Sequence, residues 1–132
     1  MLKYLFTFLV FSLFCGAGIA NPIFVDADIT YRITSDSTVN IVRLREKKGN
    51  DKTYKDSILI VPPIVEYGKR TYRVLDIEEA SFSALCCFRT LIISDGIEAI
   101  HNRAFIGCAN LKGVTIPKSV KIIGDNPFAY CI

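Results

Sequence analysis

The carboxy-terminal part of the sequence repeats itself with a period of 23 residues. Residues 74–96, 97–119 and the shorter 120–132 align, and apolar residues fill the same columns in each. The columns are Val74, Ile97 and Val120; Ile77, Ile100 and Ile123; Phe82, Phe105 and Phe128; Phe88 and Leu111; Leu91 and Val114; and Ile93 and Ile116. A fixed period in the low twenties is typical of stacked units that bury their apolar faces against one another, so we predict that these columns form the core of a solenoid.

Each unit has the pattern of one strand and one compact crossing. Leu91–Ile93 and Val114–Ile116 alternate with period two, which predicts short strands that stack in parallel with their first and third residues inward. The apolar spacing between Ile100 and Leu111 fits one to two turns of α-helix or 3₁₀-helix on the opposite side. Turns are expected at Asp95–Gly96 and Pro117–Ser119. The predicted fold is therefore an α/β repeat, a leucine-rich-repeat solenoid of 23-residue units with short parallel strands and short helical or 3₁₀ segments.

Residues 21–73 have a different pattern and are expected to form an antiparallel β cap ahead of the repeats. Ile29–Ile33 and Val39–Arg45 alternate like strands, and Ile58–Val61 reads as a buried strand that ends at two prolines. Glu66–Tyr72 has the composition of a hairpin. The expected domains are thus a cap at 21–73 and repeats at 74–132.

Residues 1–20 are expected to be a signal peptide. Lys3 precedes an uncharged apolar run, and Gly18 and Ala20 occupy the small-residue positions of a cleavage site before Asn21. Two alternatives stay open, a retained membrane anchor and a lipoprotein that is acylated at Cys15. In each case the chain leaves the cytoplasm, for the cell surface, the medium or the periplasm.

The repeat residues resemble a known family. Ala104-Phe105, Cys108, Leu111, Val114, Ile116-Pro117, Ser119-Val120 and Ile123-Gly124 follow the pattern AF-x-x-C-x-x-L-x-x-V-x-IP-x-SV-x-x-IG of BspA-type (Treponema-like) leucine-rich repeats in bacterial surface proteins. The resemblance extends from about residue 24 to the end of the chain. It departs from the pattern at Ser81, Leu85 and Pro127. The resemblance implies a secreted or surface-exposed binding module of the kind associated with adhesion to host proteins and other cells.

The resemblance also bears on the cysteines of the repeats. Cys108 and Cys131 lie 23 residues apart, and in this family their column is buried apolar packing of thiols, so Cys108 is counted with the core. A disulfide between Cys108 and Cys131, or one that uses Cys86 or Cys87, is the alternative in an oxidising compartment.

The sequence contains no recognisable catalytic or metal-binding constellation. His101 is the single histidine, there is no C-x-x-C motif, and the adjacent Glu78 and Glu79 suit a first turn of helix rather than acid–base chemistry. We therefore expect no enzymatic activity, no cofactor and no metal, and we expect His101 to be a surface loop residue.

The charge balance argues against nucleic acid as a partner. Of 16 basic residues one is Lys3, which leaves 15 against 13 acidic residues after cleavage, a net charge of +2. A basic run between Arg43 and Lys55 is either a solvated hairpin tip, with its turn at Gly49–Asn50, or a patch for an anionic surface.

Protein is the expected partner. Outward positions of the repeated strands form a face suited to an extended segment, and we predict that Thr90, Ile92, Ser94, Lys112 and Thr115 lie on it, with Gly113 nearby.

The third unit stops in an apolar stretch at Ile132. Three interpretations of this open edge are a remnant of a longer surface protein, a homo-oligomer or other assembly that pairs through the edge, and a minimal module held by its cap.

Overall fold

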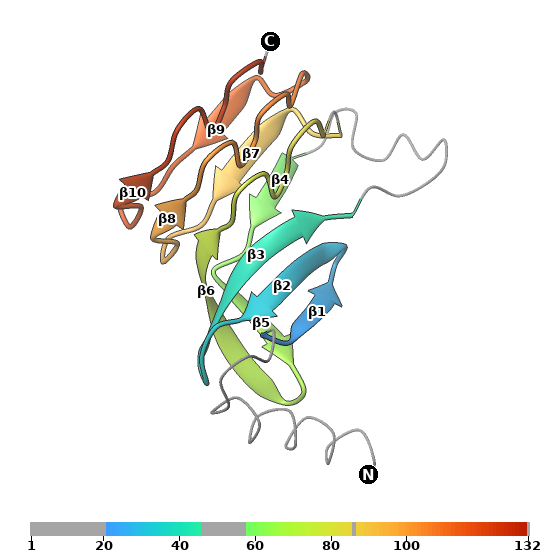
Figure 1. Cartoon of the computed structure of the whole chain (residues 1–132), viewed down its shortest axis with the longest axis vertical. Helices are drawn as coiled ribbons and strands as arrows, with labels where there is room; N and C mark the ends of the chain where they lie inside the picture. Colours follow the sequence, from blue (N-terminus) through green and yellow to red (C-terminus); the bar gives the residue numbers. More distant parts are fainter. Residues whose placement is uncertain (1–20, 46–57, 86, 132) are drawn as a thin grey trace.

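A computed structural model describes residues 21–45, 58–85 and 87–131 as ten strands in two sheets (Figure 1). The predicted signal peptide with its alternatives at Cys15, the turn at Gly49–Asn50, and the residues Cys86 and Ile132 lie outside the described residues.

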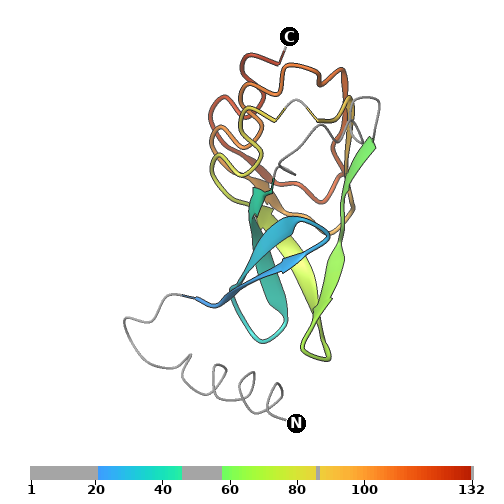
Figure 2. The same cartoon turned by 90° about the vertical axis from the view of Figure 1, so that its right-hand side faces the viewer.

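The larger sheet holds seven strands in the order β1-β2-β3-β6-β8-β10, with β5 paired to β6. Their bounds are β1 Ile23–Asp26, β2 Ile29–Ile33, β3 Thr38–Leu44, β5 Ile64–Tyr67, β6 Arg70–Ile77, β8 Ala99–Ile100 and β10 Ile122–Ile123. The smaller sheet has the order β4-β7-β9, with β4 Ile58–Val61, β7 Thr90–Ile93 and β9 Gly113–Thr115. From β6 onward the chain passes back and forth between the two sheets in successive coils (Figure 2).

The parallel pairs of the coils join residues that are 23 positions apart. In the larger sheet Ile77 is aligned with Ile100, and Ile100 with Ile123. In the smaller sheet Leu91 is aligned with Val114. The strands predicted around Leu91 and Val114 are present and parallel, so the columns of the sequence repeat are also the pairing register of the sheets.

The crossings between the sheets are turns, and the prediction of helical or 3₁₀ segments is wrong. Within the described residues the crossings form consecutive turns, at 79–84 and 102–107, and no helix. Alternate backbone N–H groups bond to the next coil, and the groups between them bond three residues back: Phe82 donates to the Ala104 carbonyl and Phe105 to the Pro127 carbonyl, both at 2.8 Å. A helix instead requires each N–H to bond four residues back in its own segment. Positive φ angles recur one repeat apart and break any helical run, at Ala80, Arg103 and Asn126, and at Ala84, Gly107 and Tyr130.

The expectation of a wholly antiparallel cap is correct only in part. β1, β2 and β3 pair antiparallel, and so do β5 and β6, whose hairpin turns at Gly68 and Lys69 with positive φ. However, β3 pairs with β6 in parallel, and β4 pairs with β7 in parallel, with Leu59 opposite Leu91. Strands β3 and β4 of the cap therefore extend the two sheets that the coils form.

Stacked aromatic rings fill the cap. Phe24 of β1 stacks on Tyr67 of β5 with ring centroids 4.2 Å apart, and on Tyr31 of β2 at 5.2 Å. These contacts bring strand β1 against β5, although the two strands are not neighbours in the sheet. Burial raises the pKa of the Tyr31 and Tyr72 phenols, and the Asp26 carboxylate adds to the effect on Tyr31.

A ladder of phenylalanines fills the coils. Phe82 stacks on Phe105 at 4.9 Å and Phe105 on Phe128 at 5.3 Å, with nearly parallel rings. Beside this ladder the Cys108 thiol donates to the Phe82 carbonyl at 3.0 Å and the Cys131 thiol to the Phe105 carbonyl at 3.2 Å. Both cysteines carry thiols, which agrees with the packing column and excludes a Cys108–Cys131 disulfide in this structure.

Burial follows the predicted core up to the last coil. Ten predicted core residues are buried, namely Val74, Ile77, Phe82, Leu91, Ile93, Ile97, Ile100, Phe105, Cys108 and Leu111. Val114, Ile116 and Ile123 are 38%, 40% and 53% exposed, so the prediction that they are core is wrong here, and Val120 and Phe128 are half-buried. The reason is position: β9 and β10 are the last strands of their sheets in the described part of the chain.

Candidate protein-binding face

The smaller sheet turns one face to solvent. Alternation along β4 and β7 buries Leu59, Val61, Leu91 and Ile93, and directs the intervening residues outward. Parallel pairing aligns the outward residues in two rows across the three strands. The rows are Ile58, Thr90 and Gly113, and Ile60, Ile92 and Thr115. We call these residues, together with Ser94 directly after β7, the outer face.

The centre of the outer face is unusually apolar for a solvated sheet. Ile58 is 58% and Ile60 57% exposed, and Ile92, opposite Ile60, is half-buried. Sheets with one solvated face normally carry polar residues on it. The exposed Ile58 and Ile60 and the half-buried Ile92 on the adjacent strand therefore form an apolar patch of the kind found at interaction sites.

The structure brings most of the predicted partner-binding residues together. Thr90, Ile92 and Thr115 are neighbours on the outer face. Ser94 extends it past the end of β7 and donates its N–H to the Val61 carbonyl at 3.2 Å. Lys112 is exposed and lies just before β9, at the border of the face rather than within it. That these residues bind a partner stays a prediction.

Sequence reasoning missed Ile58 and Ile60. The strand Ile58–Val61 was expected to be buried in the cap, but it alternates and pairs with β7. Leu59 and Leu91 are aligned across a separation of 32 residues, not 23, so the repeat gave no sign of this pairing. The available signal was composition, since four β-favouring residues ahead of two prolines also suit an outward-alternating edge strand.

The borders of the outer face carry unlike charges. Exposed Arg89 and Lys112 precede β7 and β9, and the Lys112 N–H bonds to the Arg89 carbonyl at 2.8 Å. Exposed Asp95 and Lys118 follow the same two strands. His101 is paired with Asp76 at 3.2 Å beside the larger sheet, which agrees with a surface position.

Neither a cluster of metal ligands nor a long apolar helix occurs in the described residues. Among residues 21–45, 58–85 and 87–131, no three His, Cys, Asp or Glu side chains gather as metal ligands would. The same stretches contain no helix long and apolar enough to cross a membrane. The groups that the face offers are aliphatic side chains, hydroxyls and border charges.

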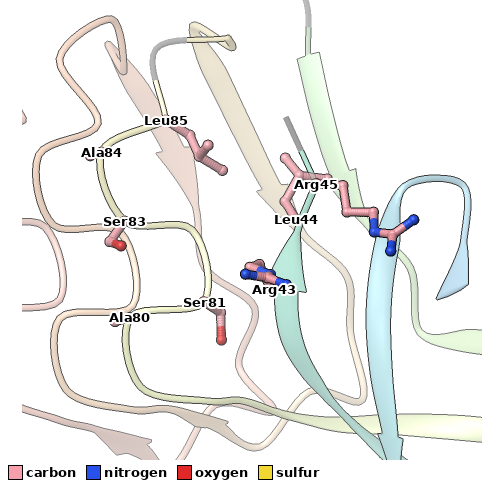
Figure 3. Close-up of a pocket in the computed structure, with 8 residues that line it drawn as sticks. All are labelled: Arg43, Leu44, Arg45, Ala80, Ser81, Ser83, Ala84 and Leu85. Carbon is pink, nitrogen blue, oxygen red and sulfur yellow. The ribbon is translucent and has the colours of Figure 1, made fainter. Parts of the chain in front are cut away.

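Apart from the outer face, the structure has a concavity where β3 meets the first crossing turns. It has a volume of about 740 Å³ and is lined by Arg43, Leu44, Arg45, Ala80, Ser81, Ser83, Ala84 and Leu85 (Figure 3). The Ser81 hydroxyl donates to the Ile41 carbonyl at 3.1 Å, and the Leu44 N–H to the Ser81 carbonyl at 3.2 Å. The hydroxyl and the carbonyl of Ser81 thus connect the cap to the coils by hydrogen bonds, and this concavity lies along the boundary between the two parts.

Comparison with known protein families identifies the type of repeat that the coils form. Residues 72–132 match the family described as "BspA type Leucine rich repeat region (6 copies)". This part of the chain is a BspA-type leucine-rich repeat. No curated protein matches the sequence.

Solved structures of leucine-rich repeat proteins share the fold. A leucine-rich repeat protein from Bacteroides ovatus is 32% identical with a TM-score of 0.71 over 82% of this chain and 27% of its own. A leucine-rich cell surface protein from Faecalibacterium prausnitzii is 26% identical with a TM-score of 0.65 over 87% of this chain and 30% of its own. A leucine-rich repeat protein from Bacteroides capillosus is 21% identical, with a TM-score of 0.64 over 82% of this chain and 91% of its own, and shows the fold alone. The chain thus spans less than a third of the first two proteins.

Proposed function

We propose that this BspA-type repeat protein is a secreted or surface-exposed protein-binding module without enzymatic activity. It binds an extended segment of an extracellular or host protein through its outer face, in the manner of an adhesion protein. The 20-residue leader directs its export. The likeness to a cell surface protein supports the location, and the family match supports binding rather than catalysis.

The domain organisation in this proposal is a cap at 21–73 and a solenoid of 23-residue units at 74–132. The cap covers the first coil through the bond between Leu44 and Ser81 and through the parallel pair of β3 and β6. The coils then supply strands β7 and β9 to the outer face, beside β4 of the cap. The smaller sheet, in which β4 of the cap pairs with β7, therefore both joins the cap to the coils and carries the outer face.

The observation that carries the proposal is the apolar centre formed by Ile58, Ile60 and Ile92. Fully burying an exposed isoleucine contributes roughly 1.5–3 kcal/mol, so covering Ile60, which is 57% exposed, contributes roughly half of that. Apolar residues near the centre of an interface, with a polar border that excludes water, provide most of its binding energy. Thr90, Ser94 and Thr115 are the polar residues of the face beside this centre, and the border charges flank them.

The test is a binding screen of the purified protein against an array of extracellular matrix and cell-surface proteins, with paired variants. We expect Ile60→Asp combined with Ile92→Asp to weaken the best interaction by at least about tenfold. The matched control is Ile64→Asp on β5, an isoleucine of similar exposure (53%) in the cap, which should leave binding unchanged. Equal effects of the two variants would reject the outer face as the binding site.

A second candidate function is assembly through the edge of the last described coil. Val114, Ile116, Ile122, Ile123 and Tyr130 are all exposed there, beside the unpaired edges of β9 and β10. Unpaired strand edges readily add further strands. Light scattering over a range of concentrations tests this candidate: it predicts oligomers of the wild-type protein that Ile123→Lys dissociates, whereas a monomer at every concentration would reject it.

A further inference from the structure

Gly113 makes a notch in the outer face. It lies in β9 opposite Thr90, and a Cβ atom added to it would meet nothing within 4 Å. Glycine weakens a strand interior because it has no side chain to pack, and it often marks a place where another chain approaches closely. The open space at Gly113 therefore has room for a partner's side chain.

The border charges give this notch a polarity. Arg89 and Lys112 place two positive charges one above the other at the amino-terminal ends of β7 and β9. At the carboxy-terminal ends the exposed Asp95 and Lys118 have opposite charges. Among the described residues, Arg89 and Lys112 therefore make the border beside Gly113 more positive than the opposite one.

Resting on the proposed function, we infer that the outer face selects an extended acidic segment of a protein. A bulky apolar side chain of this segment occupies the notch at Gly113 against Thr90, and further apolar groups cover Ile60 and Ile92. Its carboxylates face Arg89 and Lys112. Charge complementarity of this kind directs the partner's orientation and accelerates association more than it raises final affinity.

Other ligand classes fit the face less well. Bases and sugar rings are commonly bound on aromatic side chains, whereas the outer face consists of isoleucine, threonine, serine and glycine. Two border cations give a small electrostatic term compared with the several phosphate contacts of nucleic-acid binders. An acidic peptide with apolar anchors satisfies both the isoleucines and the border.

The experiment is selection of a phage-displayed library of random peptides, each about 12 residues long, on the purified protein. We expect enriched peptides to combine Asp or Glu with Leu, Phe or Trp. Synthetic versions should lose affinity at least about tenfold on Gly113→Trp, which fills the notch. Thr71→Trp, at an exposed strand position of the cap hairpin, is the matched control and should leave affinity unchanged.

Charge reversal tests the acidic preference. Lys112→Glu should slow association about tenfold at low salt and flatten its salt dependence. Lys121→Glu, at another exposed lysine, directly ahead of β10, is the control and should change neither quantity.

The outcomes separate this inference from the proposed function. Peptides that require Ile60 but are neutral or basic, or that bind Gly113→Trp as well as wild type, overturn the acidic-segment inference and leave the proposed function in place. Peptides that ignore both Ile60→Asp and Gly113→Trp overturn the proposed function as well. If selection on the wild-type protein enriches no peptide beyond what selection on the Ile60→Asp, Ile92→Asp double variant enriches, the result counts against both the inference and the proposed function.

Discussion

The coil around β7 and the coil around β9 have the same pattern and opposite environments. Leu91 and Ile93 are 0% and 2% exposed, whereas Val114 and Ile116, one repeat later, are 38% and 40% exposed. In the larger sheet Ile100 is fully buried and Ile123 is 53% exposed. The repeat therefore specifies conformation and register, but burial comes from the neighbouring coil.

Hydrogen bonding shows the same difference. The crossing of the first coil donates through Ala80, Phe82 and Ala84 to carbonyls of the second, and the second donates in the same way to the third. Within the described residues the third crossing keeps its positive φ angles at Asn126 and Tyr130 and has no next coil to donate to. The turn geometry thus does not depend on having a coil on both sides.

The largest effect is expected from the phenylalanine ladder. Phe105→Ala removes a ring stacked on both sides and should lower the free energy of unfolding by about 3–5 kcal/mol. Phe128→Ala, in the same column but half-buried, should cost roughly half as much. Urea denaturation followed by circular dichroism measures both, and equal losses would contradict the role assigned to the neighbouring coil.

Two glycine substitutions should show how closely one coil packs on the next, with a smaller effect than the phenylalanine ladder. A Cβ on Gly124 would collide with Asn102, at 2.6 Å from its backbone nitrogen, and with the His101 carbonyl carbon at 2.9 Å. Gly124→Ala should therefore destabilise the protein by about 1–3 kcal/mol through overpacking of one coil on the next.

Gly113→Ala is the control for this pair, because its Cβ meets open space. It should leave the midpoint of thermal unfolding almost unchanged. A loss at Gly113 equal to that at Gly124 would mean that glycine substitution acts on strand propensity and not on the contact between coils.

The cysteine column should show a smaller difference of the same kind. Cys108→Ala removes a fully buried thiol and its bond to the Phe82 carbonyl, which should cost about 1–2 kcal/mol. Cys131→Ala removes the equivalent bond to Phe105 from a half-buried position and should cost less than about 1 kcal/mol. The order of the two urea midpoints is the measurement, and the reverse order would contradict the comparison.

The smallest effect on stability is expected on the outer face. Ile60→Asp replaces a side chain that is 57% exposed and should change the free energy of unfolding by no more than about 0.5 kcal/mol. The same substitution at buried Ile93 should prevent cooperative unfolding, because it buries an unpaired charge. A large loss at Ile60 in chemical denaturation would show that the outer face serves the fold rather than a partner.

The sequence predicted the register of stacking, because the repeat period sets it. Columns of apolar residues 23 positions apart predicted the parallel pairing of Leu91 with Val114 and placed Ile77 and Ile100 in one core column, but they did not predict the strand pair at Ile77 and Ile100. The apolar spacing of the crossings predicted helix wrongly, because a series of turns and a helix both place Phe105 and Cys108 in the core. The distinguishing angles fall on residues such as Ala80 and Arg103, which carry no glycine signal.

The outer face was predicted for the strands inside the repeat and missed for the strand outside it. Thr90, Ile92 and Thr115 follow from alternation, whereas Ile58 and Ile60 depend on a long-range parallel pair that no local spacing records. The exposure of Ile58 and Ile60 also depends on which face of β4 the coils cover, which is a property of the assembled sheets.

The one-way bonds between crossings have a consequence for how such a gene can change length. Alternate N–H groups of a crossing pair with a carbonyl 22 residues further on, and aligned strand residues of successive coils lie 23 residues apart. Duplicating a whole 23-residue segment leaves every donor opposite an equivalent acceptor, whereas an insertion of any other length misaligns both sets of bonds at once. Tandem duplication in whole units is thus the structurally neutral change, and each new unit widens the outer face by one strand.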